Sequence, residues 1–333
     1  MKLSIVILCW NDLKVIGDCL QSLYAGTHST EFEVIVSDNG STDGSVEFVQ
    51  ERFPRVHLIE NAVNLRFAKG NNVGIRASQG EYVLILNPDT IIHDGTLDKM
   101  VAFADKHSEA GAVGCRVVNL DGSYQEHVRP LYTIRSEWCA ALGLGALAYL
   151  SDWFQPGVYV GWKGETERTV GWLAGCFILI RGDLVRRLGG FDEQFFYYYE
   201  DTDLCRRIWE AGYSIRYTPE CAITHLKGQS TKNRLTPISL ALDGCITRYL
   251  YYYKYYGAKG VLSCRRATLT SLFIRRLGYG VLQFLRPIET RRKQQEFRQT
   301  LFDWNYRLKP VRLIEHGEEP RLGIEPADRV LER

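Results

Sequence analysis

The stretch Leu3-Ser4-Ile5-Val6-Ile7-Leu8-Cys9-Trp10-Asn11-Asp12 decides the fold, because a continuous apolar run ends abruptly in polar residues. Such a run is typical of a strand that is buried on both faces of a sheet. It meets Asn11-Asp12 too early for a signal peptide and lacks a small-residue cleavage site. We therefore interpret it as the first strand of a buried sheet.

Similar apolar runs recur through the first 120 residues and alternate with stretches of helical spacing. The predicted strands are Leu3–Trp10, Glu33–Ser37, Val56–Glu60, Tyr82–Leu86 and Ala112–Val118. The predicted helices are Leu13–Tyr24, Ser45–Arg52, Gly70–Ser78 and Thr96–His107. This alternation predicts an α/β fold with a Rossmann-like, mostly parallel sheet flanked by helices. Ligands bind such sheets beyond the carboxyl ends of the strands.

The second part of the chain is less regular before its pattern returns. From about Asp121 to Thr169, glycine, aromatic and charged residues show no clear period. Gly171–Arg181 then predicts a strand, Gly182–Leu188 a helix, Glu200–Ala211 a second helix and Ser214–Leu226 an extended segment.

Composition describes an ordinary globular chain. Apolar residues make up 45% and charged residues 24% of 333 residues, which excludes a disordered, collagen-like or disulfide-stapled protein. The net charge of +2 favours no class of partner. Nine cysteines without a Cys-x-x-Cys pair indicate reduced thiols and no structural zinc. No run approaches the length of about 18–20 apolar residues that spans a bilayer.

Charge is concentrated in residues 248–312, which hold fifteen basic and three acidic residues, a net charge of +12. The pairs Arg275-Arg276 and Arg291-Arg292, together with Arg286, flank apolar helical stretches. Two alternatives remain equal. The helices dock on an anionic membrane surface, or they pack on the catalytic domain with their arginines in solvent or form a dimer interface. No nucleic-acid recognition module accompanies the charge, so we expect no nucleic-acid partner.

The first candidate site follows the second predicted strand, at Ser37-Asp38-Asn39-Gly40-Ser41-Thr42-Asp43-Gly44. Asp38 can accept a hydrogen bond from a pyrimidine ring N–H, and the turn offers backbone N–H groups. An equally compatible alternative is a simple turn in which Ser41 or Asp43 caps the next helix.

The second candidate site is Asn87-Pro88-Asp89-Thr90, directly after the predicted strand Tyr82–Leu86. Pro88 stiffens the turn, so the Asp89 carboxylate is presented at the sheet edge with little freedom. A hard divalent cation that bridges a diphosphate takes one or two such carboxylates. The alternative is a capping role for Asp89.

The third candidate site is Tyr197-Tyr198-Tyr199-Glu200-Asp201-Thr202-Asp203, at the start of a predicted helix. The helix dipole alone favours acids in a first turn. Neighbouring aromatic residues would desolvate these acids, which favours a raised pKa and general-base behaviour. His225 ends the later extended segment, and a lone histidine is more often structural.

In this order along the chain, the elements resemble family 2 glycosyltransferases with the GT-A fold, and most closely their rhamnosyltransferase-like members that build bacterial cell-surface glycans. The resemblance covers Leu3 to Ser230. It rests on Cys9-Trp10-Asn11, Ser37–Asp43, Asn64-Leu65-Arg66-Phe67-Ala68-Lys69-Gly70-Asn71-Asn72-Val73-Gly74, Asn87-Pro88-Asp89, Gly175-Cys176-Phe177, Gly190-Phe191-Asp192-Glu193, Glu200-Asp201-Thr202-Asp203 and Thr224-His225.

The resemblance implies a role for each motif. The residues expected to bind a nucleotide-sugar are Asn11, Asp38, Asn39, Lys69, Asn71, Asn87 and Asp89. Asp89 and His225 are expected to bind Mg²⁺ or Mn²⁺, and Asp201, with Glu200 beside it, is expected to be the catalytic general base. The implied reaction is an inverting, single-displacement transfer. The favoured donor is dTDP-rhamnose, and the acceptor is a glycan or a polyprenyl-diphosphate-linked sugar.

Two departures from the family pattern affect the expected metal affinity and the expected mode of synthesis. Asn87 stands where the family has the first acid of Asp-x-Asp, so metal affinity is expected to be weaker than with two carboxylates. The Gln-x-x-Arg-Trp element of processive members is missing, since Gln299 follows Gln295–Arg298. The alternatives are a UDP-hexose or UDP-N-acetylhexosamine transferase and, from another class, a nucleotide-sugar-binding protein without catalysis.

The resemblance also implies a domain organisation. We expect a catalytic domain over residues 1–230, with a nucleotide-sugar-binding half at 1–120 and an acceptor half at 121–230. A basic aromatic helical extension is expected over 231–312 and a loosely ordered tail over 313–333. The protein is expected in the cytoplasm, free or peripheral on the inner face of the cell membrane.

Overall fold

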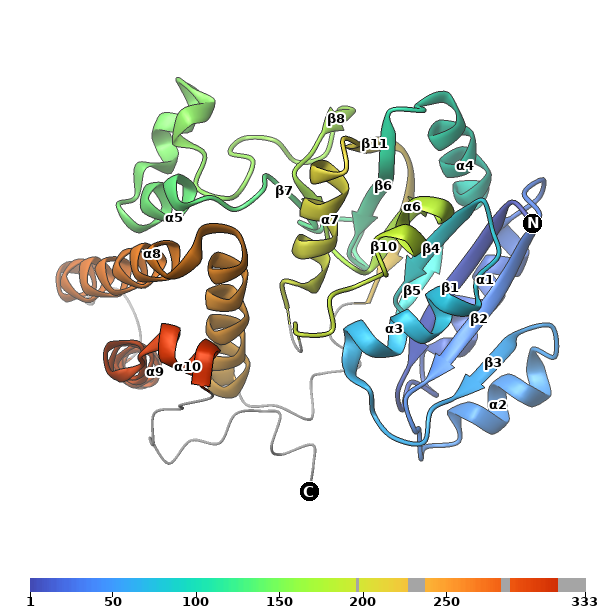
Figure 1. Ribbon diagram of the computed structural model, residues 1–333, viewed down its shortest axis with the longest axis horizontal. Coiled ribbons are helices and arrows are strands. Elements are labelled where there is room, and N and C mark those ends of the chain that lie inside the picture. Colours follow the sequence, from blue (N-terminus) through green and yellow to red (C-terminus); the bar gives the residue numbers. More distant parts are fainter. Residues whose placement is uncertain (196–197, 227–236, 283–287, 317–333) are drawn as a thin grey trace. The chain divides into compact units, whose positions relative to one another are not determined.

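The apolar runs of the first 120 residues become neighbouring strands in the computed structural model (Figure 1), which describes residues 1–195, 198–226, 237–282 and 288–316. The strands are β1 Leu3–Cys9, β2 Phe32–Asp38, β3 His57–Glu60, β4 Tyr82–Leu86, β5 Thr90–Ile92, β6 Ala110–Val118, β7 Val128–Arg129, β8 Arg168–Thr169, β9 Trp172–Leu173, β10 Phe177–Arg181 and β11 Ser214–His225. The α-helices are α1 Ile16–Gly26, α2 Ser45–Arg52, α3 Arg66–Ala77, α4 Thr96–Lys106, α5 Ile134–Ala141, α6 Gly182–Arg187, α7 Glu200–Glu210, α8 Pro237–Leu282, α9 Ile288–Arg307 and α10 Pro310–His316. Two short 3₁₀ helices, Leu144–Tyr149 and Asp152–Phe154, follow α5.

The main sheet is mixed. Its order within the described residues is β3-β2-β1-β4-β10-β6-β11-β5, and β8 pairs with β11. The first four strands are parallel, as predicted. β10 runs antiparallel to β4 and to β6, while β11 is parallel to β6. The predicted strand Gly171–Arg181 is divided, because β9 pairs with β7 outside the main sheet.

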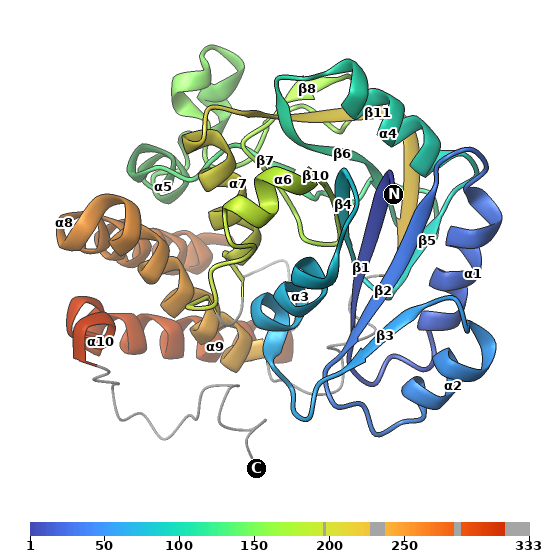
Figure 2. The ribbon, with the colours of Figure 1, turned by 45° about the vertical axis from the view of Figure 1, so that its right-hand side comes forward.

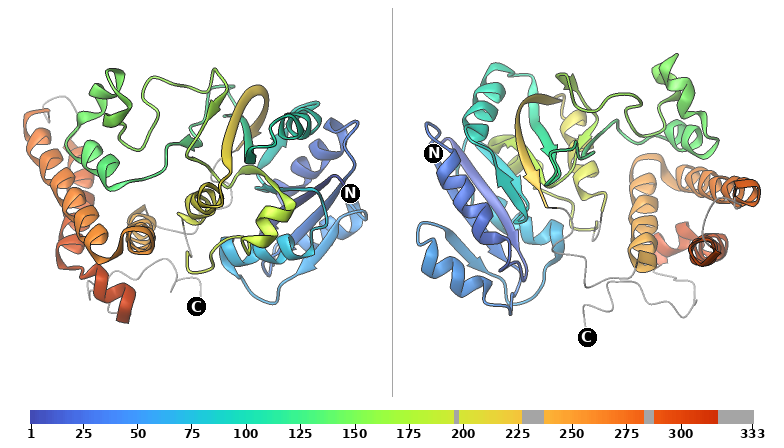
Figure 3. Two further views of the ribbon diagram at one scale, coloured as in Figure 1. Left: turned by 45° about the horizontal axis from the view of Figure 1, so that its top comes forward. Right: turned by 180° about the vertical axis from the view of Figure 1, so that it is seen from behind.

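Helices cover both faces of this sheet. On one face, α1 and α4 bury Leu20 and Met100 in the same core as Ile5 of β1. On the other face lies α3, where a Cβ atom on Gly70 would overlap Leu8 of β1. That close approach is possible only for glycine. Figures 2 and 3 show the helices on the two sides of the strands.

The chain separates into two compact units. The first contains Met1–Leu131, Trp162–Phe196 and Glu200–Asn233, and the second contains Tyr132–Gly161, Tyr197–Tyr199 and Arg234–Arg333. The predicted domain boundary at 230 and most of the predicted tail, residues 317–333, lie outside the described residues.

The second unit has a largely buried polar contact between α5 and α8. Glu137 pairs with Arg248 at 3.6 Å and accepts a hydrogen bond from the Tyr252 hydroxyl at 2.9 Å. Arg248, one of the basic residues of 248–312, therefore serves an internal contact. Most other arginines singled out there, Arg276, Arg286 and Arg291-Arg292, have side chains outside the described part of the structure.

All nine cysteines are free, as predicted, and eight of them are buried. Among the described residues, no helix is both long enough and apolar enough to cross a membrane.

Candidate active site

The carboxyl ends of three parallel strands carry predicted site residues to one edge of the sheet. β1 lies between β2 and β4, with Cys9 paired to Asp38 and Ile7 paired to Leu86. Asn11 and Asn87, which follow these strand ends, therefore lie at the same edge as Asp38. This is where an α/β sheet binds its ligands.

Asp38 is part of a closed turn. Its side chain is almost fully buried, and Ser41 donates its backbone N–H at 2.9 Å and its hydroxyl at 2.5 Å to the two carboxylate oxygens. Asn11 completes the turn, since its N–H donates to Ser41 Oγ at 2.7 Å and its Oδ1 accepts from Thr42 N–H at 2.6 Å. Asp38 therefore stabilises the turn after β2, and its recognition of a pyrimidine base stays a prediction.

The predicted N-cap position of the next helix is wrong, since Gly44, and neither Ser41 nor Asp43, occupies it, with φ 91°. Asp43 nevertheless accepts the N–H of Ser45, the first residue of α2, at 3.1 Å and its hydroxyl at 2.5 Å. It also accepts the N–H of Leu13 at 3.1 Å. The carboxylate joins the loop after β1 to the loop after β2.

Helix α3 places its two predicted ligand residues differently. Lys69 is exposed, so its ammonium group can reach a ligand from solvent. Asn71 is buried, and its Nδ2 donates to the Phe67 carbonyl at 2.9 Å while its Oδ1 has no hydrogen-bond partner. Asn39 is also buried, and its Nδ2 lies 3.2 Å from the carbonyl oxygen of Arg66. Asn39 therefore fastens β2 to the start of α3.

Sheet register brings Asp89 and His225 together. After β4, the chain turns through Asn87-Pro88-Asp89 into β5, and Thr90 of β5 pairs with His225 of β11. The Asp89 carboxylate, which is 3% exposed, lies with Oδ1 3.2 Å from His225 Nε2. Asn87 Nδ2 lies 3.4 Å from the same ring nitrogen. The two predicted metal ligands are thus adjacent, although 136 residues separate them in sequence.

Two carboxyl groups meet in the first turn of α7. Asp201 is partly buried and accepts the N–H of Gly175 at 3.2 Å and the N–H of Thr202 at 2.6 Å. Burial raises the pKa of Asp201 despite these hydrogen bonds. Burial, with the charge of Asp201, raises the pKa of Glu200 well above its usual range, and Glu200 Oε2 has no hydrogen-bond partner. The expected direction of both pKa shifts is therefore present.

A short backbone path connects Asp201 to the Asp89 turn. Gly175 donates to Asp201, and the carbonyl oxygen of the next residue, Cys176, accepts the N–H of Asn87 at 3.2 Å. Burial and the negative charges of Asp89 and Asp201 raise the pKa of the Cys176 thiol to about 12. Both carboxylates therefore act on one buried sulfur atom, which places them in the same region of the sheet edge.

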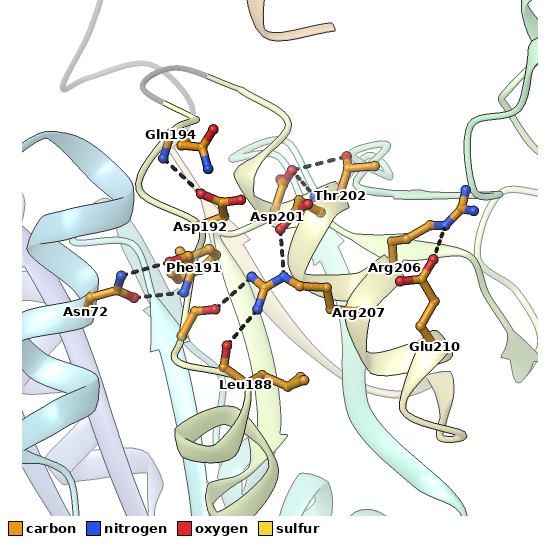
Figure 4. A network of polar contacts seen from close by, with 12 residues as sticks. Asn72, Leu188, Phe191, Asp192, Gln194, Asp201, Thr202, Arg206, Arg207 and Glu210 are labelled. Atoms are coloured by element: carbon orange, nitrogen blue, oxygen red, sulfur yellow. Dashed lines mark hydrogen bonds and ion pairs between the residues drawn. The ribbon is translucent and has the colours of Figure 1, made fainter. Parts of the chain in front are cut away.

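The loop before α7 is held by residues that sequence reasoning left without a role (Figure 4). Asn72 of α3 donates to the Phe191 carbonyl and accepts the Phe191 N–H, both at 2.8 Å. Arg207 of α7 donates to Asp203 at 2.7 Å and to the Gly190 carbonyl at 2.7 Å. Asp203 thus orients Arg207, and side chains of α3 and α7 form hydrogen bonds to the same loop. The four-residue spacing of Asp203 and Arg207 was a usable signal, whereas Asn72 stood inside the Asn64–Gly74 motif without any mark of its contact with Phe191.

Of the side-chain types that commonly bind metals, the described part of this site brings together one pair, Asp89 and His225. Among the described residues, no group of three or more His, Cys, Asp or Glu side chains is arranged to hold an ion. Of the described residues, Asp89 and His225 would supply two ligands, and a cation bound there would take further ligands, such as phosphate oxygens or water.

Comparison with known proteins identifies relatives of this chain. The model of glycosyl transferase family 2 matches residues 4–168. An N-acetylglucosaminyl-diphospho-decaprenol L-rhamnosyltransferase of Mycobacterium tuberculosis is 33% identical over 217 residues, 60% of this chain and 67% of that protein. Rhamnosyltransferase WbbL of Escherichia coli K12 is 24% identical over 201 residues, 58% of this chain and 72% of that protein.

Solved structures share the fold. The mannosyltransferase PcManGT from Pyrobaculum calidifontis, in complex with GDP-Man and Mn²⁺, has a TM-score of 0.55 and 16% identity and covers 92% of this chain and 87% of its own. Staphylococcus aureus TarS has a TM-score of 0.50 and 19% identity, and the match covers 81% of this chain and 43% of TarS. With these matches, the chain belongs to glycosyl transferase family 2 and is a glycosyltransferase similar to bacterial rhamnosyltransferases.

Proposed function

We propose that this glycosyltransferase moves rhamnose from dTDP-rhamnose to a glycan or a polyprenyl-diphosphate-linked acceptor, with inversion at the anomeric carbon. The observation that carries the proposal is the link from Asp201 through Gly175 and Cys176 to the Asn87–Asp89 turn. It puts a carboxylate with a raised pKa near a carboxylate–histidine pair at one sheet edge.

Asp201 is the proposed general base. Its carboxylate takes the proton of the acceptor hydroxyl as that oxygen forms a bond to the anomeric carbon. The bond from the anomeric carbon to the diphosphate oxygen breaks, and its electron pair leaves with the nucleoside diphosphate. A raised pKa improves the proton affinity of Asp201, and the N–H groups of Gly175 and Thr202 fix its orientation.

The donor is proposed to lie along the edge formed by β1, β2 and β4. Asp38 and Asn11 shape the turn that would meet the base, and exposed Lys69 would meet the diphosphate. Asn39 and Asn71 are buried and act through the backbone that they hold. The positive charge of Lys69 would stabilise the negative charge that develops on the leaving diphosphate.

The residues present fit a divalent cation. Two ligands that share one octahedral ion at about 2.1 Å lie about 3 Å apart, and Asp89 Oδ1 lies 3.2 Å from His225 Nε2. When bound, Mg²⁺ or Mn²⁺ would neutralise charge on the departing diphosphate. The Mn²⁺ in the mannosyltransferase of the same fold supports this assignment.

The choice of rhamnose is supported by two relatives whose names state it, and the lipid-linked acceptor by the decaprenol named in one of them. A UDP-sugar donor is the alternative, since S. aureus TarS is named as a poly(ribitol-phosphate) β-N-acetylglucosaminyltransferase and is 32% identical over 111 residues.

The test is a donor panel followed by a turnover assay. Purified protein with MnCl₂ is heated in the presence of dTDP-rhamnose, UDP-glucose or UDP-N-acetylglucosamine, because a bound donor raises the melting temperature. Release of nucleoside diphosphate is then measured with a polyprenyl-diphosphate N-acetylglucosamine acceptor. We expect dTDP-rhamnose alone to stabilise the protein and to yield dTDP. Stabilisation and turnover by a UDP-sugar alone would contradict the proposal.

Peripheral membrane contact through residues 248–312 is proposed as the way to reach a lipid-linked acceptor. Phe273, Ile274 and Arg275 of α8 are exposed together, as an interfacial helix requires. Sedimentation with phosphatidylglycerol vesicles, but not with phosphatidylcholine vesicles, is expected. Equal binding to both would contradict electrostatic docking.

A further inference from the structure

We propose that Gln125 is a positioning residue that keeps the His225 ring protonated on Nδ1, so that Nε2 presents a lone pair to the space beside Asp89. The inference rests on the proposed role of the Asp89–His225 pair. It concerns the location of a ring proton, however, and can be tested in the absence of metal.

Backbone pairing brings Gln125 to His225. The chain reverses after β6, where Val118 forms a bridge with Tyr124 and the Gln125 N–H donates to the Val117 carbonyl at 2.9 Å. Val118 also pairs with Thr224 of β11, the residue before His225. Gln125, which is 6% exposed, is therefore held against the end of β11.

The contacts of the Gln125 side chain determine which way its amide faces. Its Nε2 lies 3.1 Å from the backbone carbonyl oxygen of His225 and 2.8 Å from Asn119 Oδ1. A carbonyl oxygen only accepts hydrogen bonds, so the nitrogen of the amide must face it. Gln125 Oε1 then points to His225 Nδ1, at 2.6 Å. Because this oxygen also only accepts, Nδ1 must carry the proton.

The same polarity continues to a carboxylate at the surface. Asp121 accepts the Ser123 hydroxyl at 2.6 Å, and Ser123 Oγ accepts from Asn119 Nδ2 at 2.9 Å. Asn119 must therefore present its oxygen to Gln125. Every donor from His225 through Gln125, Asn119 and Ser123 points toward Asp121, so the negative charge of Asp121 orders the whole chain.

The consequence lies on the other side of the ring. In the neutral ring, which carries its one proton on Nδ1, Nε2 is an acceptor and faces the Asp89 carboxylate oxygen at 3.2 Å. Two acceptors at this distance favour a cation between them. In a metal-binding histidine, the ring nitrogen that does not bind the metal usually donates its N–H to an oxygen. Loss of the residue that carries this oxygen weakens metal affinity by about 10–100-fold.

The first test measures the tautomer in metal-free protein. Histidine side-chain ¹⁵N signals are recorded by NMR from labelled protein. The signals of His225 are assigned as those that disappear in the His225→Gln variant. We expect a protonated Nδ1 in the natural chain and a shift to protonated Nε2 in Gln125→Leu, where Asp89 remains the only acceptor beside the ring. Asn119→Asp is the matched control, because it keeps an acceptor for Gln125 Nε2 and should leave the His225 signals unchanged.

The second test measures Mn²⁺ affinity by electron paramagnetic resonance titration of Mn²⁺ alone. Gln125→Leu is expected to bind Mn²⁺ about 10–100-fold more weakly, and Asn119→Asp within about twofold of the natural chain. If Gln125→Leu does not fold, Gln125→Met replaces it, since it keeps the length of the side chain and also removes the amide oxygen that accepts from Nδ1.

The outcomes separate the two proposals. A neutral ring protonated on Nε2 in the natural chain, or an unchanged Nδ1–H signal in the folded Gln125→Leu or Gln125→Met variant, would overturn the role of Gln125. Failure of the natural chain to bind Mn²⁺, with the expected tautomer present, would instead overturn the metal role of Asp89 and His225 and leave the role of Gln125 supported.

Discussion

Replacement of Arg207 by Met tests how strongly the loop before α7 is held. The Arg207 guanidinium donates to Asp203 at 2.7 Å and to the carbonyl oxygens of Leu188 and Gly190 at 3.0 and 2.7 Å. Asp203 is fully buried. Removal of the guanidinium takes the paired positive charge away from this buried carboxylate and also removes the hydrogen bonds to the loop carbonyls, which costs about 3–5 kcal/mol. For a domain of ordinary size, the melting temperature should fall by roughly 6–20 °C in differential scanning calorimetry.

The neighbouring Arg206 provides a matched control. It pairs with Glu210 at 3.0 Å, also four residues along α7, but the Glu210 side chain is 52% exposed. A surface pair of this kind contributes about 0.3–0.5 kcal/mol, so Arg206→Met should lower the melting temperature by about 2 °C at most. Asp203→Asn in the Arg207→Met background should recover part of the loss, because the buried side chain at position 203 then carries no charge. Equal shifts for Arg206→Met and Arg207→Met would refute the reasoning.

Three further outcomes are expected. Burial raises the pKa of Glu200 in the folded protein. The contribution of Glu200 to the free energy of unfolding is therefore complete below its unfolded-state pKa and is lost as pH rises through the raised folded-state pKa. Glu200→Gln should therefore raise the melting temperature more at about pH 8 than at about pH 4, and an equal gain at both would contradict the shift. Gly190→Ala should destabilise the fold more than Gly189→Ala in urea unfolding, because both have positive φ (75° and 77°) but only a Cβ on Gly190 would overlap Asn72. Asp89→Ala should weaken donor binding only when Mn²⁺ is present. Calorimetry in which the natural chain binds the donor with equal affinity with and without EDTA would count against a metal site.

Much of the first unit could be predicted because its strands are buried on both faces. β1 apart from Ser4, the middle of β2 and all of β4 are apolar, and polar turns follow these strands, so Asp38 and Asp89 were found as edge residues. The helix predicted from Gly70 instead begins at Arg66. The residues around Gly70 have weak helix propensity, and packing against β1 overrides that preference.

What could not be predicted depends on contacts between distant residues. The antiparallel direction of β10 leaves no mark in its apolar run, and β5 is too short to be recognised. Asn72 meets Phe191 across 119 residues, and Gln125 meets His225 across 100. No local motif links the two members of either pair, so only the fold reveals what these side chains orient.

The proposed role of Asp201 is tested most directly by Asp201→Asn, with donor binding and nucleoside diphosphate release measured on the same preparation. The amide keeps the size of the carboxylate but cannot take a proton. Release in the presence of acceptor should fall by at least about 100-fold, while calorimetry with dTDP-rhamnose and Mn²⁺ shows an affinity within about twofold of the natural chain. Near-normal release from this variant would contradict the assignment of Asp201 as the base.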